Sequence, residues 1–227
     1  SLSGKERKRI NSMERVICLV IGYVFGLLQT GYLVGKMHHM DIRKYGSGNA
    51  GSTNALRVMG WKAGAMTFAG DCLKCVLAAA LVTLIFRNKS PEILPLLRLY
   101  AGVGATLGHN FPFYMKFKGG KGIAVLAGLI ISTSWWMTII ELIIFVTIVA
   151  LTRYISLGSL IVSMLFLMLV MVNGQLGGFG VAQSCLNEMY VLAAFLMVLA
   201  WIRHRANIGR LLKGEENKFG NPNKTKR

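Results

Sequence analysis

The sequence predicts an all-α integral membrane protein, a polytopic helix bundle of about seven transmembrane helices. Of the 227 residues, 54% are hydrophobic and only 15% are charged, against about 25% charged in an average soluble domain. The mean hydropathy is +0.52, which excludes a disordered chain. The apolar runs have room for six or seven helices of roughly 20 residues, the length that crosses a bilayer. Almost nothing remains for a separate soluble domain.

The apolar runs divide the chain into seven expected spans. A polar stretch, 1–12, precedes Met13 and is expected to be a tag remnant or a short tail. A single membrane domain is expected over 13–220, followed by a basic tail over 221–227. The fourth span is short for a bilayer crossing, so six spans remain the alternative. The expected spans are 16–35, 63–86, 96–111, 123–132, 134–151, 155–173 and 189–202.

Lysine and arginine predict the orientation. The loops after the first, third and fifth spans and the C-terminal segment together hold 17 basic residues. The opposite loops hold Arg87, Lys89 and Arg98. Cytoplasmic loops are enriched in basic residues, so the N-terminus is expected outside and the C-terminus in the cytoplasm. The net charge of +17 is therefore attributed to a membrane face and a phosphate-bearing substrate, not to nucleic acid.

Pairs of glycines spaced four apart predict close helix contacts. Such pairs let two helix backbones approach each other in lipid, because no Cβ stands between them. No internal repeat is visible, which gives no support to a transporter built from inverted repeats. The pairs are Gly22/Gly26, Gly31/Gly35, Gly60/Gly64 and Gly104/Gly108.

The first polar segment, GSGNAGSTNALR at 46–57, has the composition of an anion site. Glycines let backbone N–H groups converge on an anion, and hydroxyls and amides add hydrogen bonds. Arg57 would supply a charged fork. The alternative is a turn-rich loop in which Ser52, Thr53 or Asn54 caps the next helix. Composition alone does not choose between the two.

Two further segments on the same side share this character. In GHNFPFYMKFKGGKG at 108–122, Lys121 stands between two glycines, an arrangement suited to phosphate. In RHRANIGRLLKGEE at 203–216, His204 and Asn207 share a helix face. The cations nearby are expected to decorate the cytoplasmic face or to meet lipid phosphates. These cations are Lys116, Lys118, Arg203, Arg205 and Arg210.

Ionisable residues also occur inside the expected spans, where they are costly and often functional. Asp71 and Lys74 are three residues apart and are expected to form a structural pair that neutralises both charges. Glu141 has no local partner in the sequence, and no role is assigned to it.

These segments together resemble the acyl-phosphate-dependent glycerol-3-phosphate acyltransferases of bacterial membranes. The resemblance extends over 13–220 and includes RYISLGS at 153–159 and the Asp71–Lys74 spacing. The sequence departs from the family pattern in three places. Gln29-Thr30 stands where a small residue and proline are expected, Cys75 where glycine is common, and Glu215 where a small polar residue is usual.

The resemblance implies a seven-span enzyme of the bacterial cell membrane with its active site at the cytoplasmic face. It implies transfer of a fatty acyl group from acyl phosphate to the 1-hydroxyl of glycerol 3-phosphate. The products would be 1-acylglycerol 3-phosphate (lysophosphatidic acid) and phosphate, the first step of phosphatidic acid synthesis. No cofactor and no metal are implied. A functional link is expected to enzymes that make acyl phosphate and enzymes that use lysophosphatidic acid.

The resemblance also assigns roles to residues. Catalytic positions are Ser47, His204 and Asn207. Substrate-binding positions are Asn49, Arg57, Gly108, His109, Gly119, Gly120, Lys121 and Gly122. Structural support is expected from Asp71, Lys74 and Glu216.

Acyl phosphate is a mixed anhydride with a good leaving group, so positioning the acceptor hydroxyl supplies much of the acceleration. The H-x-x-x-x-D base of coenzyme-A-dependent acyltransferases is absent from the sequence. The base is expected to be a substrate phosphate oxygen, with His204 as the alternative and Ser47 as a covalent nucleophile also open. A transporter of a phosphate-bearing solute is the competing function. It would not explain why the cations and polar motifs lie on one face.

Overall fold

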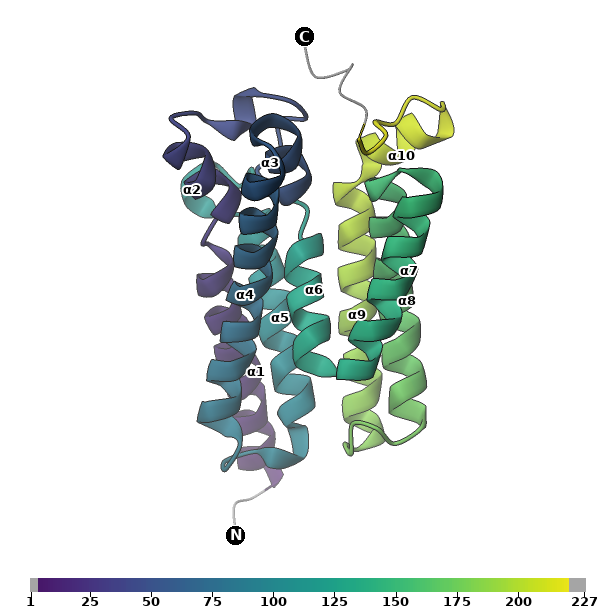
Figure 1. Ribbon diagram of the computed structural model, residues 1–227. Coiled ribbons are helices and arrows are strands. Elements are labelled where there is room, and N and C mark those ends of the chain that lie inside the picture. Colours follow the sequence, from purple (N-terminus) through teal and green to yellow (C-terminus); the bar gives the residue numbers. More distant parts are fainter. Residues whose placement is uncertain (1–3, 221–227) are drawn as a thin grey trace.

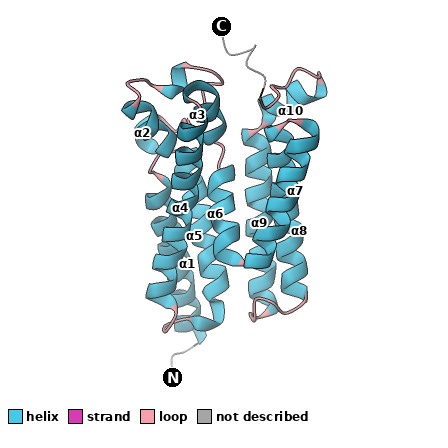
Figure 2. Ribbon diagram, viewed as in Figure 1, coloured by secondary structure: helices cyan, strands magenta, loops and turns pink. Residues whose placement is uncertain are grey.

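The computed structural model describes residues 4–220, with side chains from Ser12 onward, so the expected basic tail 221–227 lies outside the described residues. All regular elements in this range are helical, which confirms the all-α class (Figure 2). The α-helices are α1 (Gly4–Gly26), α2 (Thr30–Met37), α3 (Ser52–Met59), α4 (Trp61–Phe86), α5 (Leu94–Asn110), α6 (Ile123–Thr133), α7 (Trp135–Thr152), α8 (Ile155–Gln175), α9 (Gln183–Arg203) and α10 (Arg205–Leu212). Three 3-10 helices, η1 (Ile42–Lys44), η2 (Pro91–Ile93) and η3 (Phe113–Met115), lie between them.

The long helices α1 and α4 to α9 form the bundle, and the short helices α2, α3 and α10 gather at one end of it (Figure 1). Five segments of the described chain are long and apolar enough to cross a membrane, namely Ser12–Met37, α4, α7, α8 and α9. Helix α5 has 17 residues and α6 has 11, so both are shorter than a standard span. A multi-pass membrane protein is thus supported, and the count of seven spans stays a prediction.

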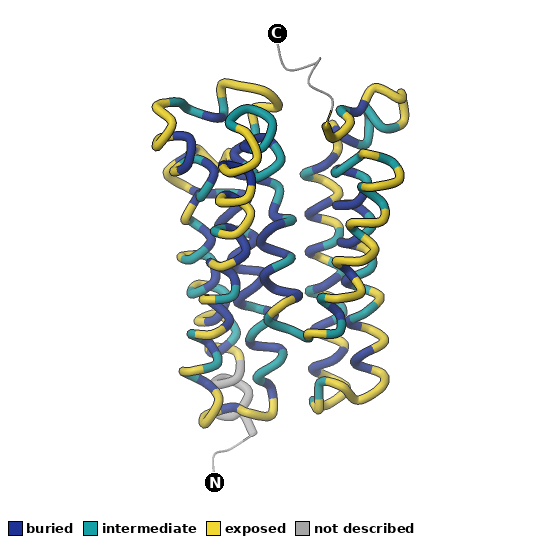
Figure 3. Tube along the Cα trace, in the orientation of Figure 1, coloured by how far each residue is buried: buried dark blue, intermediate teal, exposed yellow. Residues whose placement is uncertain are grey.

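The outer faces of the bundle are apolar, as a lipid environment requires. On α7, Leu142 is 59%, Ile143 57% and Leu151 80% exposed. A contiguous apolar surface of this kind marks contact with a membrane or another protein. Figure 3 shows the buried positions along the inner sides of the helices and the exposed positions on the outside. The core of the molecule therefore lies between the helices.

Helices α1 and α5 cross in close contact, as two of the four glycine pairs predict. A Cβ at Gly22 would lie 2.0 Å from the Ala101 carbonyl oxygen, and one at Gly104 would lie 2.1 Å from that of Leu19. Only glycine permits this approach. The glycine pair at 60 and 64 does not form a helix crossing of this kind. Gly64 packs against Leu56 of α3, and a Cβ at Gly60 would meet nothing within 4 Å.

The first expected span, 16–35, is two helices, which corrects the prediction of one. Helix α1 ends at Gly26 and α2 begins at Thr30. The Gln29 amide donates to the Gly26 carbonyl at 3.2 Å, and Lys74 Nζ donates to the Leu28 carbonyl at 2.6 Å. Unpaired backbone groups in a membrane cost several kcal/mol. These two side chains therefore satisfy the carbonyls that the break releases.

Two other boundaries differ from expectation. Helix α9 begins at Gln183, six residues before the expected start, because Glu188 is paired with Arg15 at 2.7 Å and so is tolerated inside the bundle. Arg98, counted with the loop cations, lies in α5, where its Nε donates to the Thr83 hydroxyl at 2.8 Å. The α6–α7 turn, by contrast, falls within one residue of the predicted position, with Ser134 extended between the two helices.

Candidate active site

The loop before α3 is shaped by a buried asparagine. Asn54 Oδ1 accepts from the backbone N–H of Ser47 at 2.9 Å, and its Nδ2 donates to the carbonyls of Tyr45 at 3.1 Å and Asn49 at 2.9 Å. Gly46 has a φ of 58° and Gly48 one of 70°, conformations that favour glycine. The helix cap that the sequence left open for Ser52, Thr53 or Asn54 is not made, because the N-cap residue is Gly51 and no side chain caps the helix. Asn54 instead holds Ser47 in place.

The glycine-rich loop before α6 is fixed through its backbone. The Gly120 N–H donates to the His109 carbonyl at 3.1 Å. Arg203 Nη2 donates to the carbonyls of Gly119 and Gly120, both at 2.9 Å. Arg203 therefore supports the loop, which corrects its expected role at lipid phosphates. Gly122, with a φ of 86°, opens α6, whose first N–H groups are free to face an anion.

The third segment forms a hydrogen-bonded chain around Glu216. Asn207 Nδ2 donates to Glu216 Oε1 at 3.0 Å, and Arg210 Nε donates to Glu216 Oε2 at 2.8 Å. Asn207 Oδ1 accepts from Lys121 Nζ. Arg210 is thus engaged with a carboxylate, which corrects its expected role at lipid. Glu216 supports Asn207, and Asn207 in turn contacts the glycine-rich loop.

These segments surround one cavity of about 850 Å³ at the end of the bundle that holds α3 and α10. Its lining contains members of all three motifs, and its other wall is apolar. Two lining residues, Asp71 and Glu216, were expected to give structural support only. The predicted residues in the lining are Ser47, Asn49, Arg57, Asp71, His109, Lys121, Gly122, His204, Asn207 and Glu216. The apolar wall includes Trp61, Ala65, Phe68, Phe145 and Ile155.

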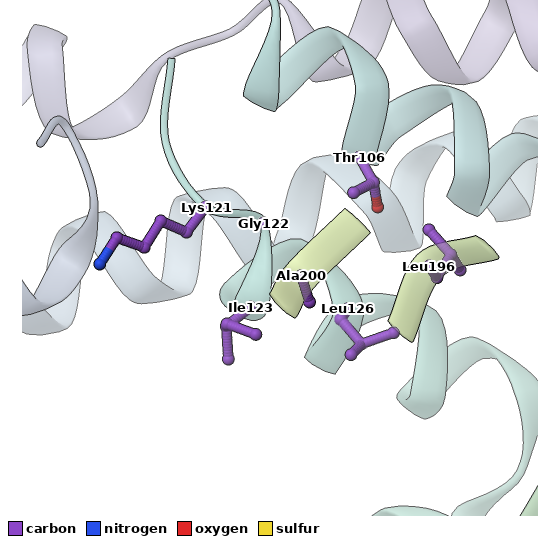
Figure 4. A pocket seen from close by; sticks show the side chains of 7 residues that line it. All are labelled: Thr106, Lys121, Gly122, Ile123, Leu126, Leu196 and Ala200. Atoms are coloured by element: carbon purple, nitrogen blue, oxygen red, sulfur yellow. The ribbon is translucent and has the colours of Figure 1, made fainter. Parts of the chain in front are cut away.

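Four predicted residues lie outside the cavity lining. Gly108 belongs to the α1–α5 contact, since a Cβ there would be 2.2 Å from the Tyr23 carbonyl oxygen. Gly119 and Gly120 support the loop through their backbones, and Lys74 is buried behind it. A separate cavity of only about 10 Å³ lies under the loop, and Figure 4 shows the Lys121 side chain pointing away from it.

Cations outnumber carboxylates in the lining of the cavity. Its two acids are already paired, Glu216 with Arg210 and Asp71 with Lys74. Arg57 makes no side-chain hydrogen bond within the described residues, and burial lowers its pKa against the opposing effect of Glu216. Burial also lowers the pKa of Lys121, to about 8. A bound anion would therefore stabilise the charged forms of both side chains.

His204 is a neutral imidazole in this environment. Burial, followed by the charge of Lys121, lowers the pKa of His204 to about 4. Its Nδ1–H donates a hydrogen bond to the Ala200 carbonyl oxygen at 2.8 Å, because a carbonyl can only accept. In a neutral ring the other nitrogen must then be an acceptor. His204 therefore offers a lone pair, not a proton, to the cavity.

Some lining residues were not predicted from the sequence, and one of them has an unusual environment. Ser156 of α8 is 6% exposed, and its hydroxyl has no hydrogen-bond partner within residues 12–220. A buried polar group without a partner is unusual and points to an interaction with something bound. The only sequence signal was its place in RYISLGS at 153–159, which does not distinguish it from its neighbours.

Comparison with known proteins gives a consistent result. The family model described as glycerol-3-phosphate acyltransferase matches residues 16–214. A glycerol-3-phosphate acyltransferase of Thermoanaerobacter sp. (strain X514) is 38% identical over 209 residues, covering 92% of this chain and 97% of that protein. One from Clostridioides difficile (strain 630) is 38% identical over 207 residues, covering 90% and 95%.

Two solved structures share the fold. One is PlsY (YgiH), an integral membrane glycerol 3-phosphate acyltransferase, in its glycerol 3-phosphate form, with a TM-score of 0.77 and 30% identity over 91% of this chain and 96% of that one. The other is the lysophosphatidic acid form, with a TM-score of 0.76 and 29% identity over 91% and 95%. The chain, an enzyme built as a multi-pass membrane helix bundle, belongs to the glycerol-3-phosphate acyltransferase family.

Proposed function

We propose that the protein transfers a fatty acyl group from acyl phosphate to the 1-hydroxyl of glycerol 3-phosphate, giving lysophosphatidic acid and phosphate. One observation carries the proposal. The cavity joins two cations without carboxylate partners, Arg57 and Lys121, to an apolar wall on α4, α7 and α8. A site for an acyl phosphate and a phosphorylated alcohol needs both features. The glycerol 3-phosphate and lysophosphatidic acid forms of PlsY support the same substrate and product classes.

The phosphates bind at the polar end of the cavity. Arg57 offers a planar fork and Lys121 a point charge, and the N-terminus of α6 adds backbone N–H groups. Ser47 and Asn49 contribute polar groups from the loop that Asn54 organises. Asn207 holds Lys121 within reach. The acyl chain lies along the apolar wall and extends from the cavity toward the surrounding lipid.

Transfer is direct. The 1-hydroxyl oxygen attacks the acyl carbonyl carbon, the carbon–oxygen bond to phosphate breaks, and phosphate leaves with the electron pair. A substrate phosphate oxygen takes the hydroxyl proton. His204 is neutral with a free Nε2 lone pair, and its pKa of about 4 makes it a weaker base than phosphate, whose second pKa is about 6. His204 is therefore not the base, and its Nε2 lone pair is left to orient the acceptor by accepting a hydrogen bond from the other hydroxyl of glycerol 3-phosphate.

The membrane placement follows from charge. The end of the bundle that holds α2, α3 and α10 also holds most of the basic loops, and we assign it to the cytoplasmic side of the bacterial cell membrane with α1 and α4 to α9 as seven spans. Helix α6, with 11 residues, is the shortest of these spans, so the bilayer beside it must be thinner than average. Reactions that form acyl phosphate would supply the donor, and reactions that acylate lysophosphatidic acid would consume the product.

A transporter of a phosphate-bearing solute is the alternative, and the test must separate the two. Purified protein is given glycerol 3-phosphate with acyl phosphate, acyl-coenzyme A or an acyl carrier protein thioester, and lysophosphatidic acid is measured by mass spectrometry. We expect lysophosphatidic acid only in the sample whose acyl donor is acyl phosphate. Product only with a thioester would overturn the donor assignment. Uptake of labelled glycerol 3-phosphate into sealed proteoliposomes, with no acylated product, would favour the transporter.

A further inference from the structure

A buried cluster of three ionisable side chains lies next to the glycine-rich loop. Lys74 of α4 places its Nζ 2.8 Å from Asp71 Oδ1, 2.6 Å from the Leu28 carbonyl oxygen and 2.9 Å from His109 Nδ1. The side chains of Asp71 and Lys74 are each 1% exposed and that of His109 is 3%. An ammonium has three N–H donors and no acceptor. The three neighbours of Lys74 thus use all three donors.

This arrangement fixes the tautomer of His109. Because Lys74 donates to Nδ1, that nitrogen must be the acceptor of a neutral ring, and the proton resides on Nε2. Asp71 Oδ1 is 3.7 Å from Nδ1, too far to compete by a hydrogen bond of its own. The assignment is opposite to that of His204, where Nδ1 carries the proton.

The protonated Nε2 lies beside Gly120 and belongs to a residue of the cavity lining. A Cβ at position 120 would be 2.0 Å from Nε2, so only glycine leaves room for the ring. His109 lines the cavity, and Nε2 has no hydrogen-bond partner in the part of the chain that the structure describes. The site thus contains a neutral N–H donor without a protein acceptor.

We propose that Asp71 and Lys74 are positioning residues that hold His109 as a neutral Nε2–H donor to an oxygen of the bound acyl phosphate. The inference rests on the proposed acyl transfer and assigns a function to a pair expected to be merely structural. A donor fixed before the substrate arrives needs no reorganisation when negative charge develops on the acyl carbonyl oxygen. A ring that could exchange tautomers would present a lone pair to that oxygen for part of the time.

Two variants of His109 test separately its Nε2–H donor to the substrate and its Nδ1 acceptor for Lys74. His109→Gln keeps an amide N–H near the position of Nε2 but removes the acceptor for Lys74. His109→Asn places its amide near Nδ1, so it keeps an acceptor for Lys74 but removes the donor to the cavity. We expect His109→Asn to lower kcat about 100-fold, the loss typical of one oxyanion donor, and His109→Gln to keep more activity. A fully active His109→Asn, or a loss confined to His109→Gln, would overturn the proposal.

A direct measurement of the tautomer does not depend on activity. Nitrogen NMR of histidine-labelled protein in lipid nanodiscs, with the His109 signals identified by their disappearance in His109→Gln, reports which nitrogen is protonated. We expect Nε2–H for His109 in the native chain and a mixed tautomer in the doubly neutral Asp71→Asn/Lys74→Met, with a lowered kcat. Nδ1–H or an imidazolium in the native chain at neutral pH would overturn the inference.

The two proposals fail differently. If the native protein makes no product from acyl phosphate, the proposed function is wrong whatever the tautomer. If it makes product while His109 carries its proton on Nδ1, only the inference fails. The native spectrum decides the second question even where the double variant does not fold.

Discussion

Arg57 and Lys121, which form no ion pair within the described residues, are the cavity side chains on which substrate affinity should depend most. We expect Arg57→Ala and Lys121→Ala each to remove a charge-assisted contact worth about 1.5–3 kcal/mol. The loss in kcat/KM is therefore roughly 10- to 150-fold. Lys118→Ala is the matched control, because this exposed lysine lies in the same loop outside the cavity. Near-native kcat/KM at limiting concentrations of both substrates would remove the mutated cation from the site.

Lys121 also makes the affinity depend on pH. Burial lowers its pKa to about 8 in the free protein, so the ammonium is present below that pH and is lost above it. KM for glycerol 3-phosphate should rise as the pH increases through about 8. Lys121→Arg stays charged throughout, and its KM should change little from roughly pH 7 to 9. The same alkaline rise in both proteins would show that another group is responsible.

The residues of the site differ in how well a sequence can reveal them. Arg57, Lys121 and His204 stand in short polar segments whose composition already suggests an anion site. Arg203 does not, because its role depends on carbonyls of Gly119 and Gly120 more than 80 residues earlier in the chain. The tautomers of the two buried histidines likewise depend on partners that only the fold brings together.

At the scale of the helices, the α1–α5 crossing is the contact with the clearest steric requirement. A Cβ at Gly104 would lie 2.1 Å from a backbone oxygen, which cannot move aside easily. Gly104→Ala should therefore lower the free energy of unfolding by about 1–3 kcal/mol through overpacking. Gly209→Ala in α10 is the control, since nothing lies within 4 Å of the added Cβ. Unfolding in detergent should show a loss for the first variant alone.

Helices were predictable where hydropathy changes sharply and were missed where tertiary contacts decide. The expected 155–173 lies within α8, and the expected 134–151 differs from α7 by one residue at each end. The break after α1 was missed because no proline marks it. The side chains of Gln29 and Lys74 stabilise the break by donating hydrogen bonds to the backbone carbonyls of Gly26 and Leu28. A hydropathy pattern contains no information about such contacts.

For the whole molecule, the distribution of basic residues predicts the orientation in the membrane. The four native cysteines are buried, so single cysteines introduced at Lys213 and Lys89 can be labelled with an impermeant maleimide. Intact cells should leave Lys213→Cys unlabelled until they are opened, and they should label Lys89→Cys from outside. Labelling of Lys213→Cys in intact cells would reverse the assigned topology and place the cavity outside.

In the proposed reaction the acyl group passes directly from acyl phosphate to glycerol 3-phosphate within this cavity. The most direct test is phosphate release by the native protein, first with acyl phosphate alone and then after glycerol 3-phosphate is added. We expect no phosphate in the first phase, then phosphate and lysophosphatidic acid in equal amounts. A burst of one phosphate per protein in the first phase, with an acyl adduct on Ser47 that disappears in the second, would contradict direct transfer.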